Sequence, residues 1–273
     1  MSGPAPAAAS SLAAGVRWRV GAWLPPLGLS IVVLALWEVV LFELDVRSFL
    51  LPRPSVILGQ LVALWPTTLA KGVAFTGSEA LAGLAVGVPL GTLAGLGTAR
   101  WAFARETVVP LAIGASTVPI IAFAPITLNW FGPESPLPRI IIVALMVFFP
   151  VLVNTIRGLT EVDHDALELM DSYAASNVQT LTKVRIPNAL PYWFTALRIA
   201  TTLSVIGAVV GEFFGGPLYS LGIYITNQTS ISDYPKAWAA IVLACALGIA
   251  FYVLAVAAER LVLPWNAARE TVR

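Results

Sequence analysis

Four ionisable residues lie within long apolar runs, where a charge is costly and requires a partner or a function. They are Glu38, Glu79, Arg198 and Glu212. The Arg198 guanidinium could attract an anionic solute, or it could form a structural ion pair with Glu38 or Glu79. The structural role is favoured, because Arg198 falls near the start of its apolar run.

Other reactive side chains are scarce. One histidine, His164, and one cysteine, Cys245, argue against a histidine metal centre, a disulfide framework and a cysteine metal site within one chain. None of the three lysines follows a glycine, so the sequence has no phosphate-binding loop for ATP. A formal net charge of +1 gives no basic face for nucleic acid. We therefore expect no catalytic residue, no metal, no bound cofactor and no nucleic-acid partner.

Composition indicates the elements that hold these residues. The 273 residues are 58% hydrophobic and 11% charged, with a mean hydropathy of +0.84. A bilayer core needs about 20 apolar residues per helix. Six such runs predict an all-α polytopic membrane protein with about six transmembrane helices, covering residues 24–42, 75–97, 107–128, 140–156, 192–210 and 237–257.

We expect one transmembrane domain over residues 17–265, between a disordered tail at 1–16 and a short C-terminal tail at 266–273. Basic residues favour the cytoplasmic side of a membrane. With six spans and the N-terminus inside, ten lysines and arginines fall inside and five outside. Both termini and residues 158–191 are therefore predicted to be cytoplasmic.

The segment 158–191 is polar, although it joins two apolar runs. Asp165 with Glu168, and Ser176 with Gln179, fit helix-capping patterns. They predict short helices over 166–173 and 177–185, the second ended by Pro187, with a turn at 174–176. A simple solvated connector is the alternative, but two capped helices are more than a connector needs.

This segment resembles the "EAA" loop of the permease subunits of bacterial ABC importers, in which Glu-Ala-Ala is followed by a Gly and by Ile-x-Leu-Pro. The matching residues are Glu168-Leu169-Met170, Ala174 and Val184-Arg185-Ile186-Pro187. Leu169 and Met170 replace the paired alanines. Ala174 replaces the glycine and lacks its freedom at positive φ. We therefore expect the turn at Ala174 to differ from the glycine turn of the family, whereas the loop keeps its role in docking to the ATPase.

Further motifs resemble the nitrate, sulfonate, taurine and bicarbonate branch of these permeases, which also includes carriers of thiamin-pyrimidine or riboflavin-like heterocycles. The motifs are Leu51-Pro52-Arg53-Pro54-Ser55, Pro119-Ile120-Ile121-Ala122-Phe123-Ala124-Pro125, Asn129-Trp130-Phe131-Gly132, Phe148-Phe149-Pro150, Asn154-Thr155 and Leu197-Arg198-Ile199-Ala200.

The resemblance implies a type I importer permease in the bacterial plasma (inner) membrane. Its partners would be a second permease subunit, the same or related, two ATPases that bind ATP and magnesium, and an external substrate-binding protein. The residues that would couple to the ATPase are Glu168, Leu169, Met170, Asp171, Ala174, Val184, Ile186 and Pro187. The transported solute does not follow from the resemblance.

Two patterns concern the interior of the bundle. Small residues every four positions on a helix let a neighbouring helix approach closely. They predict a packing seam at Gly83, Gly87, Gly91 and Gly95. The neighbour is expected to be a helix of the same chain rather than of a second permease.

Prolines at membrane depth leave backbone groups without a hydrogen-bond partner, and a cavity can satisfy them. The pathway candidates are therefore Thr117, Pro119, Pro125, Thr127, Asn129, Trp130 and Arg198.

Two other classes of membrane protein are alternatives. A gradient-driven secondary transporter would need paired buried acids, for which Glu38 and Glu79 are the candidates, and it would leave the loop at 158–191 unexplained. A membrane-embedded enzyme would need a nucleophile with its base or a metal cluster, and the single histidine and cysteine argue against it.

Overall fold

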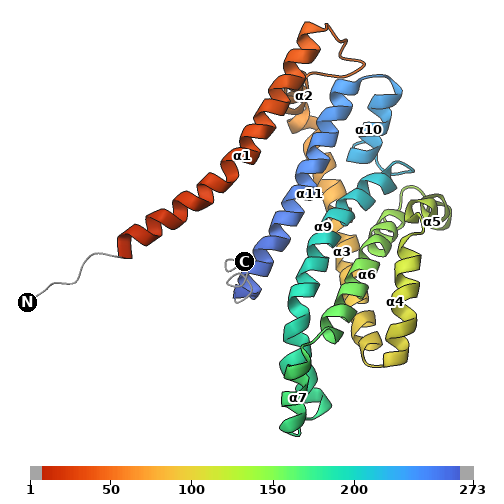
Figure 1. Cartoon of the computed structure of the whole chain (residues 1–273). Helices are drawn as coiled ribbons and strands as arrows, with labels where there is room; N and C mark the ends of the chain where they lie inside the picture. The colour runs from red at the N-terminus through yellow and green to blue at the C-terminus, as the bar shows by residue number, and fades with distance from the viewer. Residues whose placement is uncertain (1–7, 265–273) are drawn as a thin grey trace, which may run out of the picture.

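The computed structural model describes residues 8–264, with side chains from residue 25 onward except that of Ala102. Within this range the chain is helical and contains no strand, which confirms the all-α prediction (Figure 1). The helices are α1 (Ala8–Glu43), α2 (Pro54–Leu64), η1 (Trp65–Leu69), α3 (Ala70–Ala99), α4 (Ala102–Ser116), η2 (Ile120–Phe123), α5 (Ala124–Phe131), α6 (Leu137–Thr160), α7 (His164–Ser172), α8 (Asn177–Thr180), η3 (Leu181–Arg185), α9 (Ile186–Glu212), α10 (Leu221–Ser230) and α11 (Tyr234–Val262).

Five helical stretches are long and apolar enough to cross a membrane. A sixth span is obtained if a bent pair, Phe103–Ser116 with Ile120–Phe131, counts as one. This pair is bent by 75°, and the bend falls where Pro119 precedes η2. Pro119 has no backbone N–H to continue the helix. The predicted number of spans is confirmed, and the third of them is broken.

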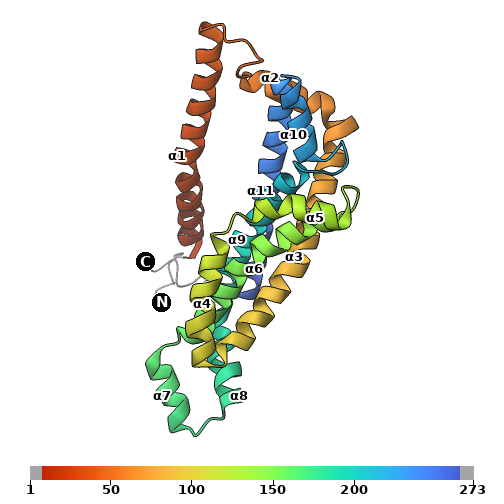
Figure 2. The same ribbon diagram turned by 90° about the vertical axis from the view of Figure 1, so that its right-hand side faces the viewer.

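The core of the bundle is formed by α3, α6 and α9, which run side by side, with α11 packed against α9 (Figures 1 and 2). Its buried side chains are mainly valine and alanine, including Val143, Val147, Ala196 and Ala208. Lipid is as apolar as the helices, so the hydrophobic effect contributes little to their association in a membrane. Small and β-branched side chains allow close helix contact, and the resulting dispersion attraction stabilises the bundle.

The α3–α6 contact is made by the four regularly spaced glycines of α3. A Cβ atom on Gly87 would lie 2.6 Å from the carbonyl oxygen of Ala144, and one on Gly91 would lie 2.7 Å from that of Phe148. Gly83 and Gly95 face Val143 and Thr155 in the same way. The seam therefore lies within the chain, and any larger side chain at its centre would push α6 away.

Helix α1 stands apart from the bundle over most of its length and joins it near α2 (Figure 2). Both oxygens of the Glu38 carboxylate accept hydrogen bonds from Ser55, one from the backbone N–H at 3.0 Å and one from the hydroxyl at 2.7 Å. Trp37 also makes an edge-to-face contact with Trp238 of α11. These contacts anchor one end of α1 and leave most of the apolar side chains between Pro25 and Phe42 exposed.

The predicted tails mostly fall outside the described residues, since positions 1–7 and 265–273 are not described. Residues 8–16, which were predicted to be disordered, instead form the beginning of α1. This run is rich in alanine, the residue with the highest helix propensity, and it continues directly into an apolar helix.

Candidate functional site

Helices α7 and α8 form a helical hairpin that projects beyond one end of the bundle (Figure 2). The N-cap of α7 is Asp163, whose carboxylate accepts a hydrogen bond from the backbone N–H of Asp165 at 3.2 Å. The predicted cap at Asp165 is wrong, because Asp163 caps a helix that begins two residues earlier than expected. On the outer surface of α7, His164 Nε2 lies 3.0 Å from Glu168 Oε1.

The turn after α7 centres on Ala174, which has a φ of 51°. The N–H of Ala175 donates to the carbonyl of Met170 at 3.0 Å, and the N–H of Ala174 donates to that of Asp171 at 2.9 Å. This is the Schellman pattern, which needs one left-handed residue. The expectation of a different turn is wrong: Ala174 adopts the conformation that glycine favours, and hydrogen bonds at the helix end offset the strain.

The second arm begins with a capping box, as the sequence predicted. The Gln179 N–H donates to the Ser176 hydroxyl at 3.3 Å, and the Ser176 N–H donates to Gln179 Oε1 at 2.8 Å. Pro187 does not end this arm, contrary to the prediction. A π-helical turn at Leu181–Arg185 precedes it, and the chain stays helical from Asn177 to Glu212. The wider turn accommodates the proline, which then occupies the first turn of α9.

The residues predicted to couple to an ATPase are divided between the two arms. Glu168, Leu169 and Asp171 are exposed on α7, with Leu169 at 54%, and Met170 is half-buried. Ala174 lies in the turn, while Val184, Ile186 and Pro187 lie where the second arm enters α9. Two large apolar side chains that the motif did not include are more exposed than Leu169: Tyr173 at 75% and Val178 at 68%.

The hairpin is attached to the bundle through side chains that sequence reasoning missed. Asn188 Nδ2 donates to the carbonyls of Gly158 and Glu161 at 2.8 and 3.1 Å. Arg185 donates to the carbonyl of Leu159 at 3.2 Å. A Cβ atom on Gly158 would lie 2.7 Å from the Cα of Ala189, so α6 and α9 touch at this level. These contacts join both ends of the hairpin into one base.

Six of the seven pathway candidates lie on the bent α4–α5 segment. Thr117 and Pro119 are at the break, and Pro125 is in the first turn of α5. Thr127 is buried and donates to the carbonyl of Ala124 at 3.0 Å, whereas the side chain of Trp130 points outward and is 73% exposed. Asn129 is also exposed.

The seventh candidate, Arg198, lies on α9. Its Nε is 3.2 Å from a carboxylate oxygen of Glu259 on α11. The predicted partners were Glu38 and Glu79, and both were wrong. Glu259 was overlooked because it lies just beyond the predicted limit of the last span, beside Arg260.

At the opposite end of the bundle from the hairpin, Arg139 and Glu79 form a buried ion pair. Arg139 Nε lies 2.6 Å from Glu79 Oε1, and the two side chains are 1% and 3% exposed. Arg139 Nη1 also donates to the carbonyl of Gly215 at 2.8 Å. Glu79 was recognised as a buried acid, but Arg139 directly precedes the apolar run at 140–156 and so fell outside the predicted spans.

Glu212 belongs to the same polar cluster. It accepts a 2.7 Å hydrogen bond from the Thr76 hydroxyl and a 2.6 Å hydrogen bond from the backbone N–H of Gly222. The Thr76 oxygen in turn accepts from the N–H of Leu221 at 3.2 Å. The cluster thus ties α3 to the end of α9 and the beginning of α10. It fixes the loop between α9 and α10 on the bundle.

Comparison with known proteins identifies the family. Residues 87–264 match the family described as "Binding-protein-dependent transport system inner membrane component". The chain belongs to this family. It is an ABC importer permease, and the matched region includes the hairpin, its base and all of α6, α9 and α11.

Three relatives illustrate the range of this permease's branch. The chain is 31% identical to the formylaminopyrimidine transport permease protein ThiX of Halalkalibacterium halodurans, over 86% of this chain and 93% of the relative. It is 29% identical to the riboflavin transport system permease protein RibX of Chloroflexus aurantiacus, over 89% and 91%. It is 28% identical to the bicarbonate transport system permease protein CmpB of Synechococcus elongatus, over 54% and 52%. The resemblance to the nitrate, sulfonate and bicarbonate branch is confirmed.

Proposed function

We propose that this permease forms a translocation pathway together with a second permease subunit and that α7 docks into a groove on a separate ATPase. Two such ATPases bind ATP and magnesium and hydrolyse the ATP, and a binding protein delivers the solute from outside. In this arrangement the chain lies in the bacterial plasma (inner) membrane. The hairpin and both termini face the cytoplasm.

The observation that carries this proposal is the shape and surface of the hairpin. It projects beyond the bundle and exposes Leu169, Tyr173 and Val178 together with the acidic residues Glu168 and Asp171. In a simple solvated connector, large apolar side chains on two capped helices would stay exposed to water, which is unfavourable. A partner protein that covers them would remove this apolar surface from water.

The base of the hairpin explains how a movement of the ATPase would reach the pathway. The first arm follows α6 and the second continues into α9, and these are the two most extensively packed helices of the core. Because Asn188 and Arg185 bind the two arms together, a displacement of α7 would move α6 and α9 as a unit. Alternating access requires such a two-state linkage.

The transported molecule is proposed as a small solute of one of two chemical classes. The names of the relatives point to a formylaminopyrimidine-like or riboflavin-like heterocycle, or to bicarbonate. The motif resemblance adds a thiamin-pyrimidine to the heterocycles, and nitrate, taurine or another sulfonate to the small anions. Arg198 does not favour the anion, since its guanidinium already has Glu259 as a partner.

Glu168→Lys tests the coupling role. We expect the variant to insert in the membrane normally and to lose solute uptake. The rate of ATP hydrolysis by the partner should no longer depend on the concentration of solute-loaded binding protein. Glu134→Lys is the matched control, because Glu134 is an exposed acid at the opposite end of the bundle, and it should still co-purify with the ATPase. Normal uptake by Glu168→Lys would refute the proposal.

The alternative, a gradient-driven secondary transporter, required Glu38 and Glu79 as a coupled acidic pair. The two carboxylates have separate partners instead, Ser55 for Glu38 and Arg139 for Glu79. Reconstitution distinguishes the mechanisms. The purified permease alone should not move solute along an ion gradient, and accumulation by the unaided chain would favour the alternative.

A further inference from the structure

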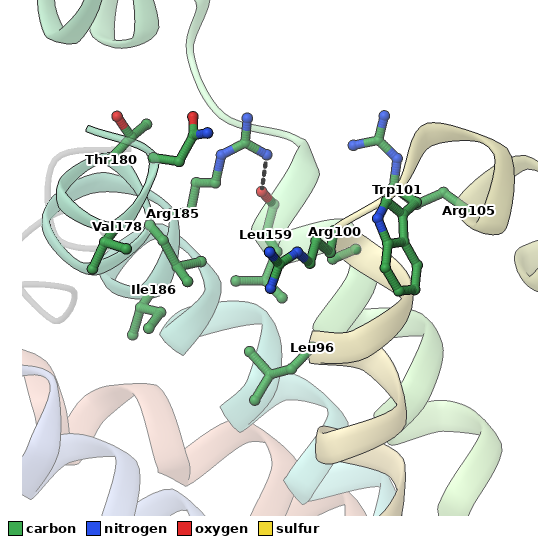
Figure 3. A pocket seen from close by; sticks show the side chains of 12 residues that line it. Leu96, Arg100, Trp101, Arg105, Leu159, Val178, Thr180, Arg185 and Ile186 are labelled. Carbon is green, nitrogen blue, oxygen red and sulfur yellow. Dashed lines mark hydrogen bonds between the residues drawn. The ribbon is translucent and has the colours of Figure 1, made fainter. Parts of the chain in front are cut away.

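A cavity of about 820 Å³ lies beside the base of the hairpin, between the corner that joins α3 to α4 and the helical arm of α8 and η3. Figure 3 shows Arg100, Arg105 and Arg185 around this cavity, with Leu96 and Ile186 on its apolar side. The lining includes these three arginines and no acidic residue. Val178 is the only one of the exposed apolar side chains assigned above to the ATPase contact that also lines the cavity, so the proposed docking surface of α7 does not account for the three arginines.

The charge of the cavity is unbalanced. Among the side chains that the structure describes, no carboxylate forms an ion pair with any of the three arginines. Arg105 and Arg185 are half-buried, and Arg185 is held in place by its hydrogen bond to the Leu159 carbonyl. Arg100 is exposed. The three guanidinium groups around one space repel one another, and an anion among them would relieve this repulsion. Guanidinium groups bind phosphate oxygens well, through paired N–H donors.

The position of the cavity indicates the source of the anion. α3 ends at Ala99 and α4 begins at Ala102, so Arg100 and Trp101 mark the end of one apolar helix and the start of the next. Trp101 is 64% exposed at this corner, as expected for an aromatic side chain at a membrane surface. The apolar side of the cavity, at Leu96, continues along α3 to Leu93, which lies one helical turn earlier. The side chain of Leu93 is 64% exposed. A free phosphate would use the arginines and leave this apolar track without a role.

We propose that the cavity binds the phosphate-bearing headgroup of an anionic phospholipid, with an acyl chain along Leu93 and Leu96. Basic pockets between helices at the membrane surface recognise such headgroups. The bound lipid would join the α3–α4 corner to the arm that carries the hairpin, and it would stabilise their relative position. The site depends on neither the transported solute nor the contacts of Glu168.

Titration of the purified full-length chain with phosphatidylglycerol, followed by native mass spectrometry, tests the proposal. Wild type should retain phosphatidylglycerol in preference to phosphatidylcholine. Arg100→Gln/Arg105→Gln should weaken this binding about 25-fold, at about fivefold for each arginine near the headgroup. Arg185 is left intact because it also holds the base of the hairpin. The control is Arg157→Gln/Arg260→Gln, which removes two exposed arginines outside the cavity and should bind as wild type does.

Three results would overturn the proposal. The first is equal phosphatidylglycerol binding by wild type and Arg100→Gln/Arg105→Gln. The second is displacement of the lipid by inorganic phosphate at matching concentration, which would make free phosphate the ligand. The third is a photo-crosslink from residue 101 to the ATPase instead of to lipid in the assembled complex, which would make the cavity a protein contact. Co-purification of the ATPase with Arg100→Gln/Arg105→Gln reports separately on the coupling role of α7.

Discussion

Arg139 and Glu79 connect α6 to α3 through a 2.6 Å contact between two almost fully buried side chains. The arginine also donates to the carbonyls of Gly215 and Pro133, so the same guanidinium fixes the loops at both sides of the contact. Glu212 and Thr76 lie in the same cluster. The end of the bundle opposite the hairpin is therefore held by polar contacts, whereas its centre is held by close packing.

Replacing Arg139 with Met should lower the free energy of unfolding by about 3–5 kcal/mol, because it leaves a buried carboxylate without its cation. The double variant Glu79→Met/Arg139→Met should recover part of this loss, since neither charge then remains unpaired. Thermal and denaturant unfolding in detergent micelles measures both effects.

Arg47→Met is the control for this series, because Arg47 is exposed in the connection between α1 and α2. Its effect should stay within about 0.5 kcal/mol. A double variant less stable than Arg139→Met alone would contradict the role assigned to the ion pair.

The glycine seam predicts opposite effects for two substitutions on one helix. Gly87→Ala places a methyl group against the Ala144 carbonyl and should destabilise the chain by about 1–3 kcal/mol through overpacking. Gly97→Ala, also on α3, has no atom within 4 Å of the new Cβ. It should be neutral or stabilising by up to about 1 kcal/mol, because alanine has the higher helix propensity. Unfolding midpoints compare the pair, and equal effects would show that α3 and α6 do not approach this closely.

The sequence was informative where one local rule determines the structure. Glycines at every fourth position must share a helix face, and the structure shows which helix that face meets. Ser176 and Gln179 form their capping box because the motif needs no distant partner. The number of apolar runs similarly predicted the number of spans.

Long-range partners could not be predicted in this way. Arg139 lies 60 residues from Glu79, and its position before an apolar run left it outside the predicted spans. Arg198 pairs with Glu259 through the packing of α9 on α11, and no spacing rule specifies that contact. Pro187 shows a different limit, since a π-helical turn let the helix continue where proline normally ends it.

Ala174 offers a test of the hairpin's turn. With its φ of 51°, Ala174→Gly should remove a strain of about 1 kcal/mol and slow amide hydrogen exchange in α7. Ala174→Val should have the opposite effect, because a β-branched residue adopts positive φ poorly. Ala175→Gly serves as the control, since Ala175 is not among the described residues with positive φ. Faster exchange in Ala174→Gly than in wild type would contradict the Schellman geometry.

Asn188 provides the sharpest test of transmission through the base. Asn188→Ala removes both donors to the Gly158 and Glu161 carbonyls, at a cost of about 1–3 kcal/mol for the groups left unpaired. Because the exposed surface of α7 is unchanged, the variant should still bind the ATPase, but it should import less solute per ATP hydrolysed. Asn154→Ala is the control: the Asn154 amide bonds only within α6, to the Pro150 carbonyl, so its loss should leave this ratio unchanged. If Asn188→Ala instead lost the ATPase altogether, or transported with the wild-type ratio, the amide would not be the link between hairpin and bundle.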